Sequence, residues 1–502
     1  MKNSAVHEKT SDTRQKSHLP STSGPPVNPW MVLSVTSLGV ILVMVNLGGL
    51  NVVLPTIARH FHAGAAIANW ILLSFMLVNT VLILVFGQFS DSFGRRKLYL
   101  LGMGLFTVVS LAIGFAANVW IFLALRALQA AGGALIITNN TALITDAFPQ
   151  ASLGKGLGIN VLVSSAAQLA GPVIGGVIAS QFGWQWVFWF GVPIGVIGVL
   201  WGIVVLRHLP SKGSGKGIDW WGGIVTFVAL SGLIVSLSEG SSLGWRSFAV
   251  LVGFGLFIVL TPLLIWLERR AVTPMFDFTL FQDRPYTMAN AATFLNAFAR
   301  VSVVLLASLY MQSVMHLDTF WAGIEVIPVT LGMLIASPLA GSWSSKVSAR
   351  VLSTLGLGIS AAGLIVLMLE FRPDAMYLPI GLGMGFVGFG SGLFLTPNTR
   401  SIMTAVPAGR RGFANGLRSM LQNMGQVLST AISLTIVTAA LPRRVQDAVY
   451  AGSVSRLSAH DMALITNGYR WAFFALLVAT GLGMGASLLR GQRRSSITRH
   501  AD

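Results

Sequence analysis

Ionisable side chains inside long apolar runs are the first candidates for chemistry in this sequence. They are Arg126, Arg300 and Glu325, and a charge in such a run is costly enough that it usually serves a function. Arg126 and Gln129 are three positions apart on one predicted helix, so their side chains share a face. At 1.5 Å per residue, Arg126 lies roughly 10 Å and Asn46 roughly 16 Å below one membrane surface. We expect these five residues around a central cavity for a substrate or a coupling ion.

Plainer interpretations exist for each of the charged side chains. Arg126 could extend its guanidinium to the nearer membrane surface, as long cationic side chains often do. Glu325 could stand at the rim of the cavity, or it could form a structural pair with Arg300. The sequence leaves these alternatives open.

A polar segment of eleven residues, 87–97, joins two apolar runs and combines one acid, two glycines and three cations. We expect a tight turn at a membrane surface, where the acid could accept hydrogen bonds at a helix N-terminus and pair with an arginine. Such a cluster could latch two parts of the protein together and release them. A simple positively charged anchor would explain Lys97 but not the acid. The predicted gating residues are Gly87, Asp91, Gly94, Arg95 and Arg96.

A second small-residue cluster lies in the predicted helix 156–180 and consists of Gly171, Pro172, Gly175 and Gly176. Proline removes one backbone hydrogen bond and kinks a helix, and glycines let a neighbouring helix approach closely. The cluster therefore indicates either a bend that seals a cavity or routine helix packing.

The second half of the chain repeats part of the first half in degraded form. The segment at 87–97 recurs 254 positions later, with Gly341 for Gly87 and Ser345 for Asp91. A slightly larger offset of 258 positions matches further glycines. Two related halves in a polytopic protein point first to a transporter. The matches at the larger offset are Gly154 with Gly412 and Gly158 with Gly416.

The composition requires a membrane protein. Hydrophobic residues make up 54% of the chain and charged residues 10%, whereas a soluble domain has roughly 25% charged residues. A spanning helix needs about 20 apolar residues and satisfies its own backbone hydrogen bonds in lipid. We predict an all-α protein with fourteen transmembrane helices at 30–57, 68–89, 98–117, 119–141, 156–180, 184–206, 218–238, 247–267, 288–312, 320–341, 349–369, 376–397, 412–440 and 468–489.

Lysine and arginine set the orientation. They concentrate in alternate loops, for example Lys155, Lys346 and Arg350, whereas the other loops hold few, such as Arg59 and Arg246. By the positive-inside rule, both termini are predicted to be cytoplasmic. The net charge of +17 then indicates contact with an anionic bilayer and requires no nucleic acid. Residues 1–29 and 491–502 are predicted to be tails, the first a disordered segment and not a cleaved signal peptide.

Several classes of function lack support. The chain has no cysteine, which rules out disulfides and thiolate metal sites, and no His or acidic pair has metal-ligand spacing. It also lacks a phosphate-binding glycine-rich loop with lysine, so ATP is not expected to supply energy. We therefore expect no metal, no cofactor and no enzyme activity.

Taken together, the motifs resemble those of the major facilitator superfamily. Segment 87–97 resembles its signature between helices 2 and 3, and residues 125–133 resemble its helix 4 motif. Residues 171–176 are similar to the helix 5 motif of antiporters. Residues 184–188 and 192–195 are similar to the sixth helix of the fourteen-helix drug:proton antiporter branch. The likeness covers about residues 30–490.

One departure from that branch concerns the first helix, where Asn46 occupies the position of the usual Asp. Asn46 cannot titrate, so the proton carrier is left open. Glu325 is the best remaining acid in a span, and Asp91 is the second. With Arg126 and Arg300 against one deep acid, we predict a neutral to positive cavity that prefers neutral, zwitterionic or anionic amphipaths over cations.

The resemblance implies a fold and a function. The fold is two six-helix bundles, 30–206 and 288–490, with an inserted helix pair at 218–267. The function is secondary export of amphipathic small molecules or drugs from the cytoplasm, by proton antiport and alternating access in a bacterial inner or plasma membrane. A periplasmic adaptor partner is left open. The alternatives are an exporter or facilitator of one metabolite, lipid or anion, and a transport-inactive scaffold or sensor.

Overall fold

In this computed structural model, the described residues are 28–63, 65–207, 209, 219–271, 278–315, 317, 319–372, 375–439 and 459–490. Their regular structure is entirely helical. The predicted tails lie outside the described residues except for positions 28 and 29. The α-helices are α1 (Pro29–His60), α2 (Ala65–Phe93), α3 (Arg95–Ile113), α4 (Val119–Ala147), α5 (Leu153–Phe182), α6 (Gln185–Trp189), α7 (Gly191–Leu206), α8 (Trp220–Leu243), α9 (Phe248–Arg270), α10 (Arg284–Ser313), α11 (Thr319–Glu325), α12 (Ile327–Trp343), α13 (Ala349–Glu370), α14 (Tyr377–Ala405), α15 (Arg411–Ala439) and α17 (Ala459–Leu488).

Membrane spans account for nearly all of these helices. Among the described residues, thirteen helical segments are long and apolar enough to cross a bilayer. The remaining predicted span, 412–440, forms α15, which has 29 residues but is too polar to meet the same criterion. Several of its polar side chains donate hydrogen bonds to other helices: Asn415 to α4, Asn423 to α2 and Ser429 to α10. Such contacts explain how a more polar helix belongs to a membrane bundle.

Two predicted spans are each divided into two helices. The span at 184–206 breaks at Phe190, and the span at 320–341 breaks at Val326. Pro193 and Pro328 follow these breaks. Because proline has no backbone N–H, neither residue can continue the hydrogen-bond ladder from the preceding helix.

The tight turn predicted within the segment 87–97 is confined to one residue, because most of the segment is helical. Helix α2 continues to Phe93 and α3 begins at Arg95, so Gly94 alone makes the corner. Its φ of 99° lies in the left-handed region, which glycine adopts without steric strain. The acid of this segment therefore projects from the last turn of a helix.

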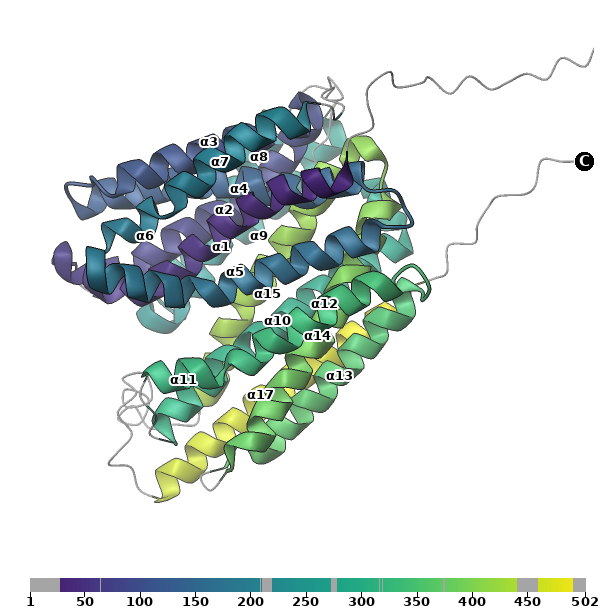
Figure 1. Cartoon of the computed structure of the whole chain (residues 1–502). Coiled ribbons are helices and arrows are strands. Elements are labelled where there is room, and N and C mark those ends of the chain that lie inside the picture. The colour runs from purple at the N-terminus through teal and green to yellow at the C-terminus, as the bar shows by residue number, and fades with distance from the viewer. Residues whose placement is uncertain are drawn as a thin grey trace, which may run out of the picture.

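The helices form two groups, α1–α7 (the N-group) and α10–α17 (the C-group), shown in Figure 1. The main contacts between them are α2 against α15 and α5 against α12. Helices α8 and α9 pack on each other, and α8 also contacts α2 and α15. An apolar cluster containing Leu84, Leu230 and Phe413 joins these three helices. The division into two six-helix bundles and an inserted pair remains a prediction.

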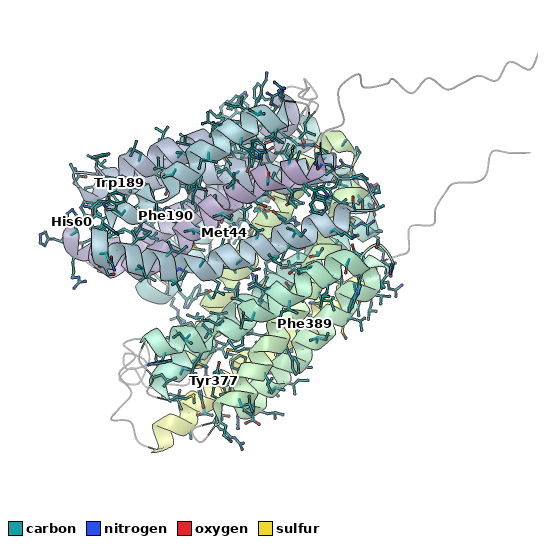
Figure 2. All side chains as sticks on the ribbon, viewed as in Figure 1. Met44, His60, Trp189, Phe190, Tyr377 and Phe389 are labelled. Atoms are coloured by element: carbon teal, nitrogen blue, oxygen red, sulfur yellow. The ribbon has the colours of Figure 1, made fainter. Side chains whose placement is uncertain are left out.

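The molecule has two ends along the helix axes. We call one end the terminal side; α1 begins there and α17 ends there. We call the other end the distal side; it carries His60 and Trp189 in Figure 2. The two groups lie close together on the terminal side and diverge toward the distal side (Figure 1).

Candidate functional site

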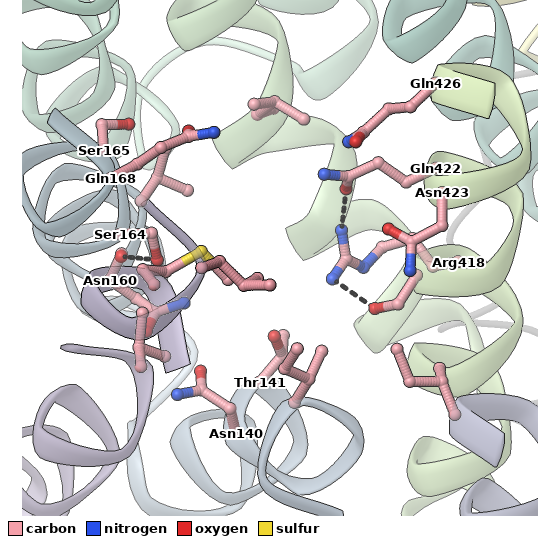
Figure 3. A pocket seen from close by; sticks show the side chains of 18 of the residues that line it. Asn140, Thr141, Asn160, Ser164, Ser165, Gln168, Arg418, Gln422, Asn423 and Gln426 are labelled. Carbon is pink, nitrogen blue, oxygen red and sulfur yellow. Dashed lines mark hydrogen bonds between the residues drawn. The ribbon is translucent and has the colours of Figure 1, made fainter. Parts of the chain in front are cut away.

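A cavity of about 260 Å³ lies between the two groups. Helices of both groups line it, and Figure 3 shows polar side chains facing one another across it. Asn160 and Gln168 project from α5 on one side, and Arg418, Gln422 and Gln426 project from α15 on the other. Apolar side chains of α1 and α2 complete the wall. The site can therefore accommodate a compound with both polar and apolar parts.

The charged residues of the cavity wall are both arginines. Arg300 on α10 and Arg418 on α15 line the cavity, whereas no Asp or Glu is among its lining residues. Arg300 was predicted from the sequence, but Arg418 was not. The available signal was its position within the predicted span 412–440, where a charge is as unusual as in the other spans.

Asp91 connects the two groups on the terminal side. Its Oδ1 accepts a hydrogen bond from the backbone N–H of Gly412 at 3.0 Å, and its Oδ2 accepts one from Phe413 at 2.9 Å. These are the second and third N–H groups of α15, within its first turn, where the helix dipole favours a negative charge. Arg95 lies 2.7 Å from the same carboxylate. Arg96 makes none of the hydrogen bonds described for this corner.

A second acid extends this network. Asp146, at the end of α4, accepts a hydrogen bond from Arg411 of the C-group at 2.7 Å and another from Arg95. Arg95 also donates to the carbonyl oxygen of Ala408 across the interface. Two carboxylates and two guanidiniums thus join the groups at the α2–α15 interface. Asp146 and Arg411 were not predicted as gating residues, because they are 265 positions apart in sequence.

The repeated glycines meet across both interfaces. A Cβ on Gly87 would lie 2.9 Å from the carbonyl oxygen of Gly412, and one on Gly341 would lie 2.6 Å from that of Gly154. Both distances are shorter than real Cβ contacts, so only glycine allows these backbone approaches. The residues that match in the repeat therefore occupy equivalent places in the α2–α15 and α5–α12 interfaces.

The two interfaces differ in chemistry. At α5–α12, Ser345 replaces the acid and bonds only locally, to the carbonyl oxygen of Ser342 at 3.0 Å. Instead, Arg400 donates to the carbonyl oxygen of Gln150 in the N-group at 2.9 Å and to that of Ser344. At α5–α12, an arginine thus donates to backbone carbonyl groups of the other helix group. At α2–α15, a carboxylate instead accepts from backbone N–H groups.

Asn46, Arg126 and Gln129 meet inside the N-group and do not line the cavity. Arg126 Nη1 donates to Asn46 Oδ1 at 3.0 Å and to Gln129 Oε1 at 2.5 Å. The guanidinium lies 4.5 Å from the ring centroid of Phe75, and the residue is fully buried. Burial excludes the alternative in which Arg126 reaches the membrane surface. The structure thus brings the three residues together, but it does not place them on the cavity wall.

Glu325 also lies away from the cavity. It ends α11 toward the distal side, and its backbone carbonyl accepts a hydrogen bond from Tyr377 at 2.9 Å. The described ion pairs do not join it to Arg300, whose Nη1 lies 3.7 Å from the sulfur of Met333. The structure therefore brings neither the predicted pair nor a carboxylate into the cavity.

The glycine–proline cluster of α5 packs against α1. A Cβ on Gly171 would lie 2.8 Å from the Cα of Gly48, and the ring of Pro172 also borders Gly48. Gly175 contacts Gly49 in the same way, whereas Gly176 has more room beside Val52. The cluster thus holds two helices of the N-group together.

The described residues do not form a cluster of metal ligands. Within them, no three His, Asp or Glu side chains come together as a metal site would require.

The chain is similar in sequence to known membrane transport proteins. A family model described as Major Facilitator Superfamily matches residues 36–430 and 289–500. Multidrug resistance protein Stp of Mycobacterium tuberculosis is 32% identical over 411 residues, covering 82% of this chain and 76% of that protein. Riboflavin transporter RibZ of Clostridioides difficile is 29% identical, covering 80% and 87%. The tetracenomycin C resistance and export protein of Streptomyces glaucescens is 27% identical, covering 83% and 77%.

Solved structures show the same fold. The proton:xylose symporter XylE has a TM-score of 0.63 at 15% identity, covering 92% of this chain and 96% of that one. The human organic anion transporter MFSD10 has a TM-score of 0.60 at 14% identity, covering 91% and 100%.

Proposed function

Because this chain belongs to the major facilitator superfamily, we propose that it is a secondary active exporter of amphipathic small molecules that works by alternating access. The chain is a multi-pass membrane transporter and not an enzyme, as its family and its thirteen apolar helical segments establish. The direction of transport, the substrate and the driving ion are the proposed parts.

In this proposal, the terminal side faces the cytoplasm of a bacterial cell. Lys97, Lys155, Arg269, Lys346 and Arg410 all lie at helix ends on this side, as the positive-inside rule requires. Loops on the distal side carry fewer cations. The structure then represents a state that is closed to the cytoplasm.

The pattern of contacts between the groups carries the proposal. The described hydrogen bonds that cross from the N-group to the C-group join residues 80–150 to residues 400–423, and the one deepest in the membrane links Thr80 with Asn423. No described hydrogen bond crosses on the distal side. Breaking the terminal-side contacts would open the cavity to the cytoplasm, which is the rearrangement that alternating access needs.

Proton antiport is the proposed driving reaction. Because no carboxylate lines the cavity, we assign the proton carrier first to Asp91 at the α2–α15 interface. Glu325, which ends α11 outside that interface, becomes the second candidate. A proton on Asp91 would remove the charge that holds the N-terminus of α15. Protonation would in this way favour release of the interface.

A second candidate is export of a single small metabolite. The cavity of about 260 Å³ falls slightly below the range of about 300–1,000 Å³ that is usual for ligand pockets, which favours a small compound. The names of the relatives support both candidates, since two refer to resistance and one to a riboflavin transporter. Membership of a transporter family argues against the third alternative, a transport-inactive scaffold.

Flux measurements on the purified full chain in proteoliposomes test the proposal. A panel of labelled neutral, anionic and cationic amphipaths is measured with an imposed pH gradient and again after an ionophore removes it. We expect gradient-dependent flux of several compounds. Flux of one compound alone supports the single-metabolite candidate, and absence of flux for the whole panel, together with no protection of cells against these compounds, contradicts the exporter.

A further inference from the structure

The two arginines of the cavity wall point to a specific substrate class. We propose that Arg300 and Arg418 form an anion-binding site that holds the carboxylate or another acidic group of an amphipathic substrate; this inference rests on the proposed transport function. The apolar part of the substrate then packs against α1 and α2.

Arg418 is oriented without being neutralised. Its Nε donates to Asn415 Oδ1, its Nη1 to Gln422 Oε1 and its Nη2 to Ser419 Oγ, each at 3.1 Å. All three acceptors are uncharged and lie on α15 itself. A guanidinium has five N–H groups, so two remain for a ligand. Figure 3 shows this side chain directed into the cavity, with its hydrogen bond to Gln422.

Arg300 has fewer partners still. Its described contact is the sulfur of Met333 at 3.7 Å, which is a weak acceptor, and its Nε is buried with no hydrogen-bond partner. An unpaired cation in a membrane protein is costly. A bound anion would supply the missing acceptors.

The cavity wall combines the two charged side chains with apolar ones, and uncharged polar side chains lie among them on both groups. Both arginines come from the C-group, on helices α10 and α15 that pack together. The apolar residues include Met44, Leu47 and Phe75 of the N-group. An amphipathic anion can contact both the charged and the apolar side chains, whereas a cation would face two like charges.

Labelling of a single engineered cysteine measures the cavity charge directly, because the chain has no cysteine. Ser164→Cys places a thiol on the cavity wall, and Arg246→Cys places one in the exposed loop between α8 and α9. The purified full chain in detergent is treated with sulfonatoethyl or trimethylammonioethyl methanethiosulfonate, which are similar in size and opposite in charge. At Ser164→Cys we expect the anionic-to-cationic rate ratio to exceed that at Arg246→Cys by about tenfold.

Charge and geometry are separated by substitution. Arg418→Gln and Arg300→Gln should each lower this ratio toward that of the loop site, whereas Arg470→Gln, an exposed arginine on α17, should leave it unchanged. Arg418→Lys should keep the ratio. Equal ratios at the two cysteines, or a ratio that does not respond to either glutamine variant, would overturn the proposal.

A matched pair of ligands tests the bound group. We expect 1-naphthylacetate to slow labelling of Ser164→Cys at concentrations about tenfold lower than its uncharged amide, 1-naphthylacetamide. Arg418→Gln should remove this difference, and Arg418→Lys should reduce it, because an ammonium lacks the planar pair of donors. Equal protection by the two compounds, including none by either, contradicts the assignment of a carboxylate.

The two proposals fail in different ways. Charge-selective labelling with no flux in proteoliposomes contradicts the proposed exporter but retains the anion site. Gradient-driven flux with no charge selectivity retains the transporter and contradicts the anion site.

Discussion

Arg126 Nη1 lies 3.0 Å from Asn46 Oδ1, within the fully buried interior of the N-group. The guanidinium therefore has neutral acceptors and the face of Phe75 around it, with no carboxylate among its described partners. Its Nε and Nη2 have no hydrogen-bond partner. Asn46 occupies the position at which the related antiporter branch usually carries an acid. The buried positive charge of Arg126 is therefore only partly compensated.

Asn46→Asp is expected to stabilise the protein. A carboxylate at this distance would make a charge-assisted hydrogen bond to a cation that is already buried, which should raise the free energy of unfolding by about 1–2 kcal/mol after the desolvation of the acid. Thermal unfolding of the purified protein measures the change, and Asn46→Leu, which removes the acceptor, should lower the stability. Because Asn46 is not on the cavity wall, substrate preference should stay the same; a gain in cation export would place this residue in the transport path.

Asp91→Asn is expected to impair transport while the protein remains folded in the membrane. The amide keeps the shape of the side chain but removes the charge that faces the N-terminus of α15 and Arg95. Loss of a charged partner at a helix N-terminus weakens the contact by about 0.3–2 kcal/mol, so the closed state should become less populated. Flux and membrane abundance are measured together. Normal flux at normal abundance rules out gating by Asp91, and loss from the membrane supports a structural anchor.

Gly341→Ala should open the terminal side. The added methyl group would meet the carbonyl oxygen of Gly154, so α5 and α12 cannot approach as closely. Asn415, which bonds to the carbonyl oxygens of Ile137 and Thr138 in the closed interface, is a suitable reporter. We expect faster labelling of Asn415→Cys when Gly341→Ala is present.

Gly104→Ala is the matched control, because a Cβ at Gly104 has no atom within 4 Å. Equal labelling in the two glycine variants would show that the close approach at Gly341 does not limit opening.

The membrane topology can be checked with the loop cysteine. Arg246 lies between α8 and α9, after seven transmembrane segments. If the N-terminus is cytoplasmic, this loop is outside the cell, so we expect Arg246→Cys to be labelled from outside by an impermeant maleimide. A cysteine in place of Lys346, at the α12–α13 corner, should react only after the membrane is permeabilised. The reverse pattern would contradict the proposed orientation.

The membrane spans could be predicted from the sequence because long apolar runs have few alternatives in lipid. The tertiary contacts could not. Gly87, Ser90 and Asp91 are turn-forming residues in isolation, yet α2 continues through them because this last turn packs on α15. The repeat predicted which glycines are equivalent, but it did not predict that Gly87 meets Gly412 of the other half.

The cavity residues show the same limit. Arg418 follows Arg410 and Arg411 closely in sequence and resembles a continuation of that surface cluster. The predicted span 412–440 already placed Arg418 about two turns into a helix, but only the structure shows that this side chain borders the cavity. Asn46 and Arg126 could be matched by depth, but periodicity could not distinguish the cavity wall from the interior of one helix group.

The position of the α8–α9 pair has a consequence for compounds dissolved in the bilayer. Helix α8 contacts both α2 and α15, so protein covers this interface on its lipid side, whereas α5 and α12 lie at the front of Figure 1 with no helix before them. When the terminal side opens, the gap between α5 and α12 faces the hydrocarbon directly. A lipophilic molecule would then have a lateral route to the cavity along one flank of the transporter and a shielded flank opposite it.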